Sequence, residues 1–295
     1  NTDNQFIGRE KGGNYFDGYL ADINFIDGAA KAPTDFGEVN DNGVWVPIKY
    51  SGSYGTNGYY LEFQQTGTSQ NSSGIGADTS GNDNHFAVNN LAATDVTVDT
   101  PTNNFATLNT LNKASNVTLT EGNCKAAIAG SGQSRAVTSS IAVSSGKWYW
   151  EINYTTDVEA GFVGVITADG AWNPSGSDLA NNGSDDNVGY ISGGNKYING
   201  SASSYGDGWD DGDTISVLLN IDDDEVIFYK NGTAQNSGTA ISKTFSGFYY
   251  AVVQHTSSSG TSNFSMNFGN PPHSISSGNA DADGHGNFEY AVPSG

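Results

Sequence analysis

Apolar and polar residues alternate in short runs from about residue 113 onward, and the clearest pair of runs lies within residues 212–232. There, TISVLLNI at 214–221 and EVIFY at 225–229 are separated by three consecutive Asp residues at 222–224. Val, Ile, Leu and Phe at this density favour a pleated, largely buried sheet. Three Asp residues in a row favour a solvated turn. The pattern therefore predicts a β-hairpin, around which the second half of the chain is organised.

Further apolar runs of strand length flank this hairpin, separated by clusters of Gly, Ser, Asn and Asp. They lie at residues 136–143, 147–154, 160–167, 187–191, 247–254 and 263–268. Short strands at this spacing are typical of an antiparallel sandwich. Trp148 and Trp150 lie two positions apart on one predicted strand, so they share a face, and we expect both to face the core. The sequence predicts an all-β fold class with a β-sandwich over residues 113–270.

Residues 1–65 carry two more strand-like runs, around residues 14–19 and 20–26, in which apolar and polar positions alternate. An aromatic segment follows, with a hairpin signal at Thr56-Asn57-Gly58. Its tyrosines have two interpretations, a sugar-binding shelf or packing onto a neighbouring domain. We favour packing, because buried aromatic residues dominate cores and interfaces. These tyrosines are Tyr50, Tyr54, Tyr59 and Tyr60.

Two segments lack strand periodicity. Residues 66–112 are rich in Gln, Ser, Gly, Thr and Asn, and this composition predicts an extended linker between the two domains. Residues 271–295, which follow the last predicted strand, are expected to leave the second domain as an exit connector. The predicted order is therefore domain, linker, domain and connector.

A possible calcium loop lies within the exit connector. Asn279, Asp281, Asp283 and Gly284 match positions 1, 3, 5 and 6 of a calcium-loop pattern. Position 12 is Tyr290, so the bidentate Glu of that pattern is missing. Calcium bound by Asp281 and Asp283 is one hypothesis, and a Gly- and Asp-rich turn with no cofactor is the other.

The charge balance restricts the classes of partner. The chain has 32 acidic and 11 basic residues, a formal net charge of −21. Nucleic acid and anionic membranes both require clustered Lys and Arg, so we expect neither as a partner. The sequence has no run of 18 apolar residues, so we expect no membrane insertion. A single cysteine, Cys124, rules out an intramolecular disulfide framework.

Several segments of the second half, in order, resemble the SPRY family. They are GKWYWEI at 146–152, GFVGV at 161–165, NVGY at 187–190, the hairpin at 212–232, YYAVV at 249–253 and MNFG at 266–269. The resemblance implies a β-sandwich that presents binding loops and carries no chemistry of its own. The sequence departs from the family in its richness in Asn and Asp, so the identity of the partner does not carry over.

The first segment, FIG at 6–8 and YFDGYLADI at 15–23, resembles the closing strands of a laminin-G-type, concanavalin-A-like sandwich. The front strands of that fold would precede Asn1, so we expect either that the sequence is a piece of a longer polypeptide or that another chain covers this half sandwich. The complete order of segments resembles bacteriophage virion proteins of the tail-fibre or appendage type. This resemblance implies a place on the virion surface, outside the cell, contacts with other virion subunits and a homo-oligomer.

The sequence favours binding over catalysis. It contains no GxSxG, HExxH or Walker motif, and its Asp clusters fall at predicted turns, where such runs are normally solvated. We therefore expect no enzyme. In the SPRY family the equivalent loops line the partner-binding face, so the resemblance implies that loop aromatic residues, with neighbouring Asp210, bind the ligand. An aromatic ring can stack on the apolar face of a sugar. The aromatic candidates are Trp172, Tyr197, Tyr205 and Trp209. The alternative for Trp209 is that its ring closes the end of the sandwich.

Three hypotheses of function follow. The first is an appendage protein whose SPRY-like domain binds a glycan or protein on the host surface. The second is a purely structural capsid or tail protein that binds neighbouring subunits. The third is a fragment of a polysaccharide depolymerase, which would require two carboxylates facing each other across a cleft.

Overall fold

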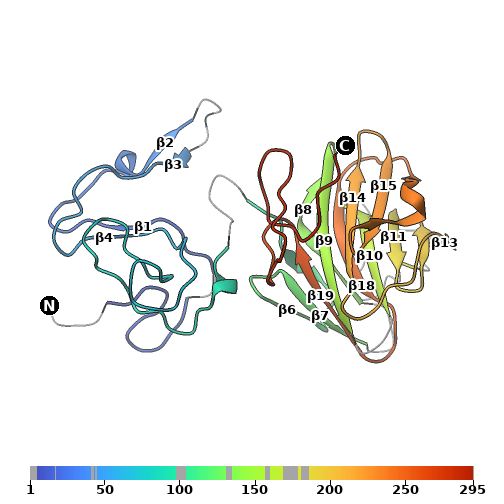
Figure 1. Cartoon of the computed structure of the whole chain (residues 1–295), viewed down its shortest axis with the longest axis horizontal. Coiled ribbons are helices and arrows are strands. Elements are labelled where there is room, and N and C mark those ends of the chain that lie inside the picture. Colours follow the sequence, from blue (N-terminus) through green and yellow to red (C-terminus); the bar gives the residue numbers. More distant parts are fainter. Residues whose placement is uncertain are drawn as a thin grey trace. The chain divides into compact units, whose positions relative to one another are not determined.

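The computed structural model describes residues 5–16, 18–40, 43, 45–97, 104–130, 135–156, 160–168, 179–180 and 186–294. The chain forms two compact units, Asn1–Asn104 and Phe105–Gly295. Strands dominate the second unit, whereas the first unit is mostly loops with short strands (Figure 1), and the described residues contain no α-helix. The all-β prediction is confirmed. None of the helical segments among the described residues has the length and apolar character needed to cross a membrane.

The described residues of the first unit form two small antiparallel sheets and two short 3₁₀ helices. Its elements are β1 (Ile23–Phe25), η1 (Pro33–Asp35), β2 (Gly37–Val39), β3 (Trp45–Pro47), β4 (Tyr59–Leu61) and η2 (Ala93–Asp95). Strand β1 pairs with β4, and β2 pairs with β3. Three of the four tyrosines form a small core, in which Tyr54 lies edge-on to Tyr50 and parallel to Tyr60. These rings pack within their own unit.

The predicted strands of residues 14–19 and 20–26 are only partly formed. The described residues of the first run form no strand, and the second run is a strand only at β1. Asp22 explains the late start, because its φ of 49° is left-handed and interrupts the extended backbone. Its carboxylate accepts a hydrogen bond from the Tyr60 hydroxyl at 2.7 Å, which ties this turn to β4.

The predicted linker of residues 66–112 differs from the structure. Its described residues up to 97 belong to the first unit, and those from 105 onward begin the second. The Asp78 carboxylate, 5% exposed, accepts hydrogen bonds from the N–H groups of Tyr60 and Asn84 at 2.8 and 2.9 Å. The Asn84 amide donates to the Gly58 carbonyl at 2.9 Å. Composition alone missed these contacts because the Asp and Asn residues that mark a solvated loop also satisfy backbone groups.

The second unit is a sandwich of two antiparallel sheets (Figure 1). The first sheet has the order β13-β12-β11-β10-β18-β8-β5. Its strands are β5 (Leu108–Lys113), β8 (Arg135–Val143), β10 (Gly161–Thr167), β11 (Asn187–Ile191), β12 (Asn195–Ile198), β13 (Ser201–Ser204) and β18 (Tyr249–His255).

The second sheet has the order β16-β15-β14-β9-β19-β7-β6, with β17 beside β15. Its strands are β6 (Val117–Thr120), β7 (Lys125–Ala129), β9 (Lys147–Thr156), β14 (Thr214–Asn220), β15 (Glu225–Lys230), β16 (Thr233–Ala234), β17 (Ile241–Ser242) and β19 (Thr261–Asn267). A 3₁₀ helix, η3 (Gln235–Gly238), follows β16. The hairpin prediction is confirmed, because β14 pairs with β15 in a register that begins at Asn220 and Glu225, on either side of the Asp turn.

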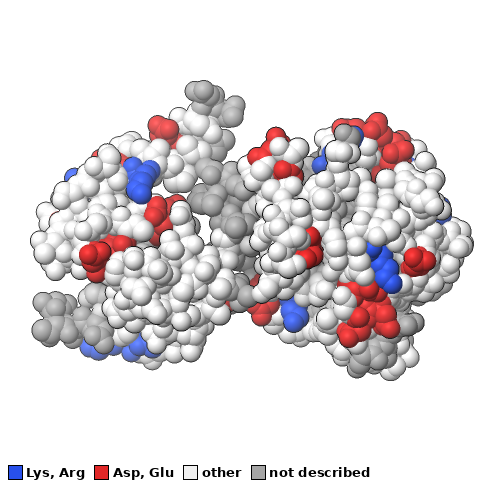
Figure 2. All heavy atoms as spheres, viewed as in Figure 1, with Lys and Arg blue, Asp and Glu red and all other residues white. Residues whose placement is uncertain are grey.

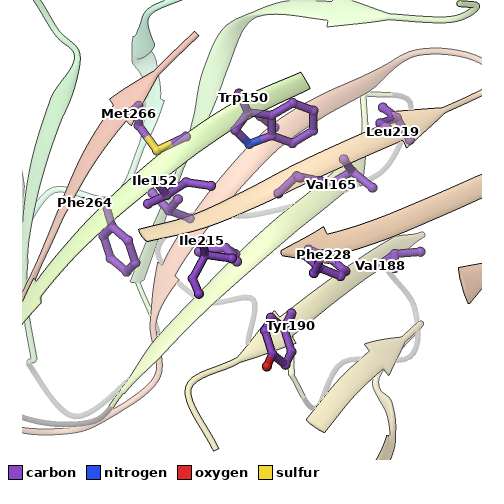
Figure 3. Close-up of a cluster of buried hydrophobic side chains, with 14 of the residues drawn as sticks. Trp150, Ile152, Val165, Val188, Tyr190, Ile215, Leu219, Phe228, Phe264 and Met266 are labelled. Atoms are coloured by element: carbon purple, nitrogen blue, oxygen red, sulfur yellow. The ribbon is translucent and has the colours of Figure 1, made fainter. Parts of the chain in front are cut away.

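The main core lies between the two sheets. Trp150 and Ile152 of β9 face Val165 of β10 and Val188 of β11 across the interface (Figure 3). Alternation on β9 places every second side chain inward. Trp150 is accordingly 5% exposed, but Trp148 at the start of the strand is 46% exposed. The prediction that both rings face the core is therefore wrong for Trp148, which lies where the strand begins.

The C-terminal segment does not leave the domain as predicted. Phe288 is only 5% exposed and packs edge-on against the ring of Tyr149 with centroids 5.1 Å apart. Tyr149 points to the outer face of the second sheet, opposite Trp150. The described residues after β19 therefore return to cover part of that outer face.

Candidate functional site

The loop that joins β13 to β14, residues 205–213 and here called the acidic loop, collects several of the predicted binding residues. Its sequence is YGDGWDDGD. Tyr205 and Trp209 are buried, with exposed fractions of 6% and 1%. Asp207, Asp210 and Asp211 are exposed. The loop thus alternates between aromatic anchors in the core and carboxylates in water.

The two aromatic anchors pack among rings from both sheets. The Trp209 ring lies edge-on to Tyr154 with centroids 4.8 Å apart, and the Tyr205 ring lies edge-on to Tyr190 at 5.4 Å. The Tyr205 hydroxyl oxygen accepts a hydrogen bond from the N–H of Phe228 at 3.1 Å, and burial raises the pKa of this hydroxyl. Neither ring is open for stacking on a ligand. Trp209 instead lies in the main core of the second unit.

Charged and amide groups hold the second half of the acidic loop. Lys230 Nζ donates to the Gly208 carbonyl at 2.7 Å and lies 3.1 Å from the Asp213 carboxylate. Asp213 also accepts hydrogen bonds from the Asn231 amide at 2.7 Å and the Asp210 N–H at 2.9 Å. Burial alone would raise the pKa of Asp213, but these donors and Lys230 outweigh it, so the pKa is lowered. Asp213 is therefore a structural carboxylate.

Gln235 and Thr156 hold the rest of the acidic loop. Gln235, 4% exposed, accepts a hydrogen bond at Oε1 from the Asp207 N–H at 2.8 Å. The Thr156 N–H donates to the Asp211 carboxylate at 2.9 Å. Sequence reasoning missed Gln235 and Lys230, because they come from 28 and 22 positions away and neither lies in a recognisable motif.

Asp207 and Asp210 present exposed carboxylates on this loop. Among the described residues, neither carboxylate has an ion pair or a side-chain hydrogen bond. Figure 2 shows acidic side chains gathered in patches on the second unit, with few basic side chains among them. Free carboxylates on a fixed backbone accept hydrogen bonds from hydroxyl groups or pair with cations without ordering a loop first.

The remaining predicted ligand-binding residues do not join this site. Tyr197 of β12 is half-buried and packs in a second cluster with Phe162, with ring centroids 6.5 Å apart. Tyr205 and Trp209 belong to the main core instead. Trp172 lies outside the described residues. Of the predicted set, Asp210 alone presents an exposed side chain at the acidic loop.

The residues of the possible calcium loop form a turn in the structure. The Asp281 carboxylate accepts hydrogen bonds from the N–H groups of Asp283 and His285 at 3.0 and 2.8 Å. The Asn279 amide donates to the Glu289 carbonyl at 3.0 Å. No group of three or more His, Cys, Asp or Glu side chains suited to a metal ion occurs in the described part of the chain. The Asp281 carboxylate thus caps its own turn.

Comparison with known proteins identifies the middle of the second unit. The model of the SPRY domain family matches residues 147–271. No curated protein matches the sequence. Three solved structures illustrate the structural similarity. The SPRY domain of human HERC1 has a TM-score of 0.44 and 19% identity, and the match covers 54% of this chain and 96% of that one. Stonustoxin has a TM-score of 0.44 and 17% identity, and the match covers 55% of this chain and 27% of the stonustoxin chain. The PSpry domain of TRIM65 has a TM-score of 0.43 and 14% identity, and the match covers 54% of this chain and 88% of that one.

Proposed function

Because residues 147–271 form a SPRY domain, commonly a protein-interaction module, we propose that this chain is a non-enzymatic binding protein. In this proposal the second unit recognises its partner through the acidic loop. The partner is a glycan or a protein on the surface of a host cell, and the chain is part of a phage appendage. The resemblance of the ordered segments to virion proteins supports that setting.

The observation that carries the proposal is the construction of the acidic loop. Two buried rings and the side chains of Lys230 and Gln235 fix its backbone, while Asp207 and Asp210 remain exposed. Fixing a loop before binding reduces the entropy lost on association. A partner that presents hydroxyl or cationic groups fits these carboxylates.

Binding by the full chain to immobilised bacterial surface glycans and to Lys- and Arg-containing peptides tests this proposal. The Asp207→Asn/Asp210→Asn variant should bind at least about tenfold more weakly, since hydrogen bonds to charged groups are worth about 1.5–3 kcal/mol. Glu121→Gln, an exposed carboxylate on a turn between β6 and β7, is the matched control and should bind as the unchanged chain does. Equal binding by all three proteins contradicts the role of the acidic loop.

Assembly with other virion subunits is a second candidate, favoured by the surface of the first unit. Large apolar side chains are exposed there in unusual number for one short stretch. They are Tyr15, Phe16, Tyr19, Leu20, Phe25, Val39, Trp45 and Ile48. An open hollow of about 400 Å³ runs beside Tyr15, Phe16 and Leu20. Sedimentation of the full chain and of Tyr15→Ser/Phe16→Ser tests it, because a subunit contact through this surface should be lost in the variant.

A further inference from the structure

Strand β13 forms one edge of the first sheet, and its outer side is open. All four of its residues, Ser201–Ser204, are exposed, and Figure 1 shows the strand at the rim of the second unit. It pairs with β12 in an unbroken register, from Ile198 opposite Ser201 to Asn195 opposite Ser204. In the described part of the chain no other strand pairs with β13. Such an edge presents unpaired N–H and C=O groups to solvent.

The backbone groups that face outward are those of Ala202 and Ser204. The N–H of Tyr205, directly after the strand, donates to the carbonyl of Gly194, directly before β12, at 3.2 Å. Backbone groups of successive residues point to opposite sides of a strand, so those of residues 201 and 203 also face β12. The groups of Ala202 and Ser204 therefore face away from it. Among the described residues, they form no hydrogen bond with a loop or a side chain.

The other sheet edges of the second unit have features that hinder an added strand. Strand β5, at the opposite edge of the same sheet, is irregular, because its register with β8 shifts between Leu108 and Lys113. At β6, an edge of the second sheet, Lys113 Nζ donates to the Val117 carbonyl at 2.8 Å. Strand β16, at the other edge, has only two residues. Irregular pairing, a covering lysine and a very short strand all protect edges. Strand β13 has a regular register and contains no Lys or Pro.

The acidic loop follows β13 directly and gives this open edge a negative charge. Asp207 lies three positions after Ser204, so the two Cα atoms are at most about 11 Å apart. The carboxylates of Asp207 and Asp210 are exposed. Lys196, the basic residue of β12, lies over the Tyr205 ring, with Nζ 5.8 Å from the ring centroid. A segment that pairs with β13 and continues past Ser204 therefore carries its next side chains toward carboxylates.

We infer that β13 accepts an extended, basic segment of a partner protein as an added strand, with Lys or Arg side chains beside Asp207 and Asp210. This inference rests on the proposed function, since the acidic loop is the charged half of the same site, and it identifies the partner as a protein. Hydrogen bonds to the backbone of Ala202 and Ser204 supply affinity, and the carboxylates select a basic segment. Charge argues against a second copy of this chain, because each copy has a formal net charge of −21.

Three synthetic peptides test the inference with the full chain. The peptide KKTVTVT has a β-forming part and two Lys residues at the end that lies beside the acidic loop in an antiparallel pair. The peptide EETVTVT reverses that charge. The third peptide is KKTVTVT with N-methyl groups on its Thr and Val residues, so it keeps the charge but its extended part cannot donate main-chain hydrogen bonds. The second and third peptides should each bind at least about tenfold more weakly than the first.

Two variants at one position test the edge itself. Ala202→Pro removes an outward N–H, and an edge strand tolerates proline there because the missing donor faces solvent. This variant should bind KKTVTVT at least about tenfold more weakly. Ala202→Thr keeps the N–H, is the matched control and should bind as the unchanged chain does. Hydrogen–deuterium exchange of the unchanged chain needs no variant, and exchange over residues 201–204 should slow when KKTVTVT is added.

The outcomes separate this inference from the proposed function. If KKTVTVT binding is weakened by Asp207→Asn/Asp210→Asn but not by N-methylation or Ala202→Pro, the added strand is overturned and the acidic loop keeps its role. If only a glycan binds, and its binding depends on Asp207 and Asp210, the result is the same. Equal binding of every ligand by Asp207→Asn/Asp210→Asn and the unchanged chain contradicts the proposed function and this inference together. Self-association of the unchanged chain that Ala202→Pro abolishes would assign the edge to a second copy and also overturns the inference.

Discussion

The backbone N–H of Tyr290 donates to the Glu151 carboxylate at 2.8 Å, although the two residues lie 139 positions apart. A buried carboxylate is stable only when its oxygens are hydrogen-bonded, and here four donors supply those bonds. Burial, followed by the nearby Glu151 charge, raises the pKa of the Tyr149 hydroxyl, so that hydroxyl remains a donor at neutral pH. The end of the chain is thereby part of the second unit.

Removal of the Glu151 carboxylate should destabilise the second unit. Glu151→Ala leaves the N–H groups of Glu289 and Tyr290 without their acceptor, and the free energy of unfolding should fall by about 1–3 kcal/mol. Urea unfolding followed by tryptophan fluorescence measures the change. The control is Glu121→Ala, an exposed residue, which should change the value by less than about 0.5 kcal/mol. Equal stability of both variants would show that the C-terminal contact contributes nothing.

The Trp209 ring should stabilise the fold and should not contact a partner directly. Trp209→Ala opens a cavity among Tyr154 and Tyr190 and should cost about 3–5 kcal/mol. Trp148→Ala removes a ring that is 46% exposed and should cost much less. Thermal unfolding measures both. A Trp209→Phe variant that is folded but loses only partner binding would instead assign the ring to recognition.

Lys230 should affect partner binding because it holds the acidic loop, although its charge does not contact the partner. Lys230→Met removes the hydrogen bond to the Gly208 carbonyl and the ion pair with Asp213, while Asp207 and Asp210 stay in place. The stability cost should be about 1 kcal/mol, typical of partly exposed pairs. Partner affinity should fall more than stability, because the acidic loop must then be ordered on binding. Unchanged affinity in the folded variant contradicts the need for a fixed loop.

Acidification should remove the contribution of Asp213 to the stability of the fold. Burial opposes its ionisation, but the N–H of Asp210, the Asn231 amide and Lys230 lower its pKa below the ordinary value of an aspartate. A carboxyl whose pKa is lower in the folded chain stabilises the fold above its unfolded pKa, and that stabilisation disappears as the pH falls through the folded pKa. The difference in Tm between the unchanged chain and Asp213→Asn should therefore be full at neutral pH and shrink below about pH 4. A difference that is independent of pH would exclude an ionised Asp213.

The sequence predicts the sandwich well because its strongest signals are local. The run of Asp residues 222–224 between two apolar runs places the turn between β14 and β15 directly. Trp209 shows the limit of such signals. Its neighbours Gly208 and Asp210 are those of an exposed loop, yet the ring is buried because Tyr154 and Tyr190 surround it in space. The return of the C-terminal segment has no local signal at all, since Glu151 lies on a distant strand.

A salt titration of partner binding shows most directly whether the acidic loop recognises the partner. Full-length protein and Asp207→Asn/Asp210→Asn are titrated with the glycan or cationic peptide that binds most tightly in the screen. We expect saturable binding by the unchanged chain and binding at least about tenfold weaker by the variant at low salt. For a cationic peptide the difference should narrow as salt screens the exposed carboxylates, whereas for a glycan it should persist. Saturable binding of equal strength by both proteins at every salt concentration would show that Asp207 and Asp210 do not recognise the partner.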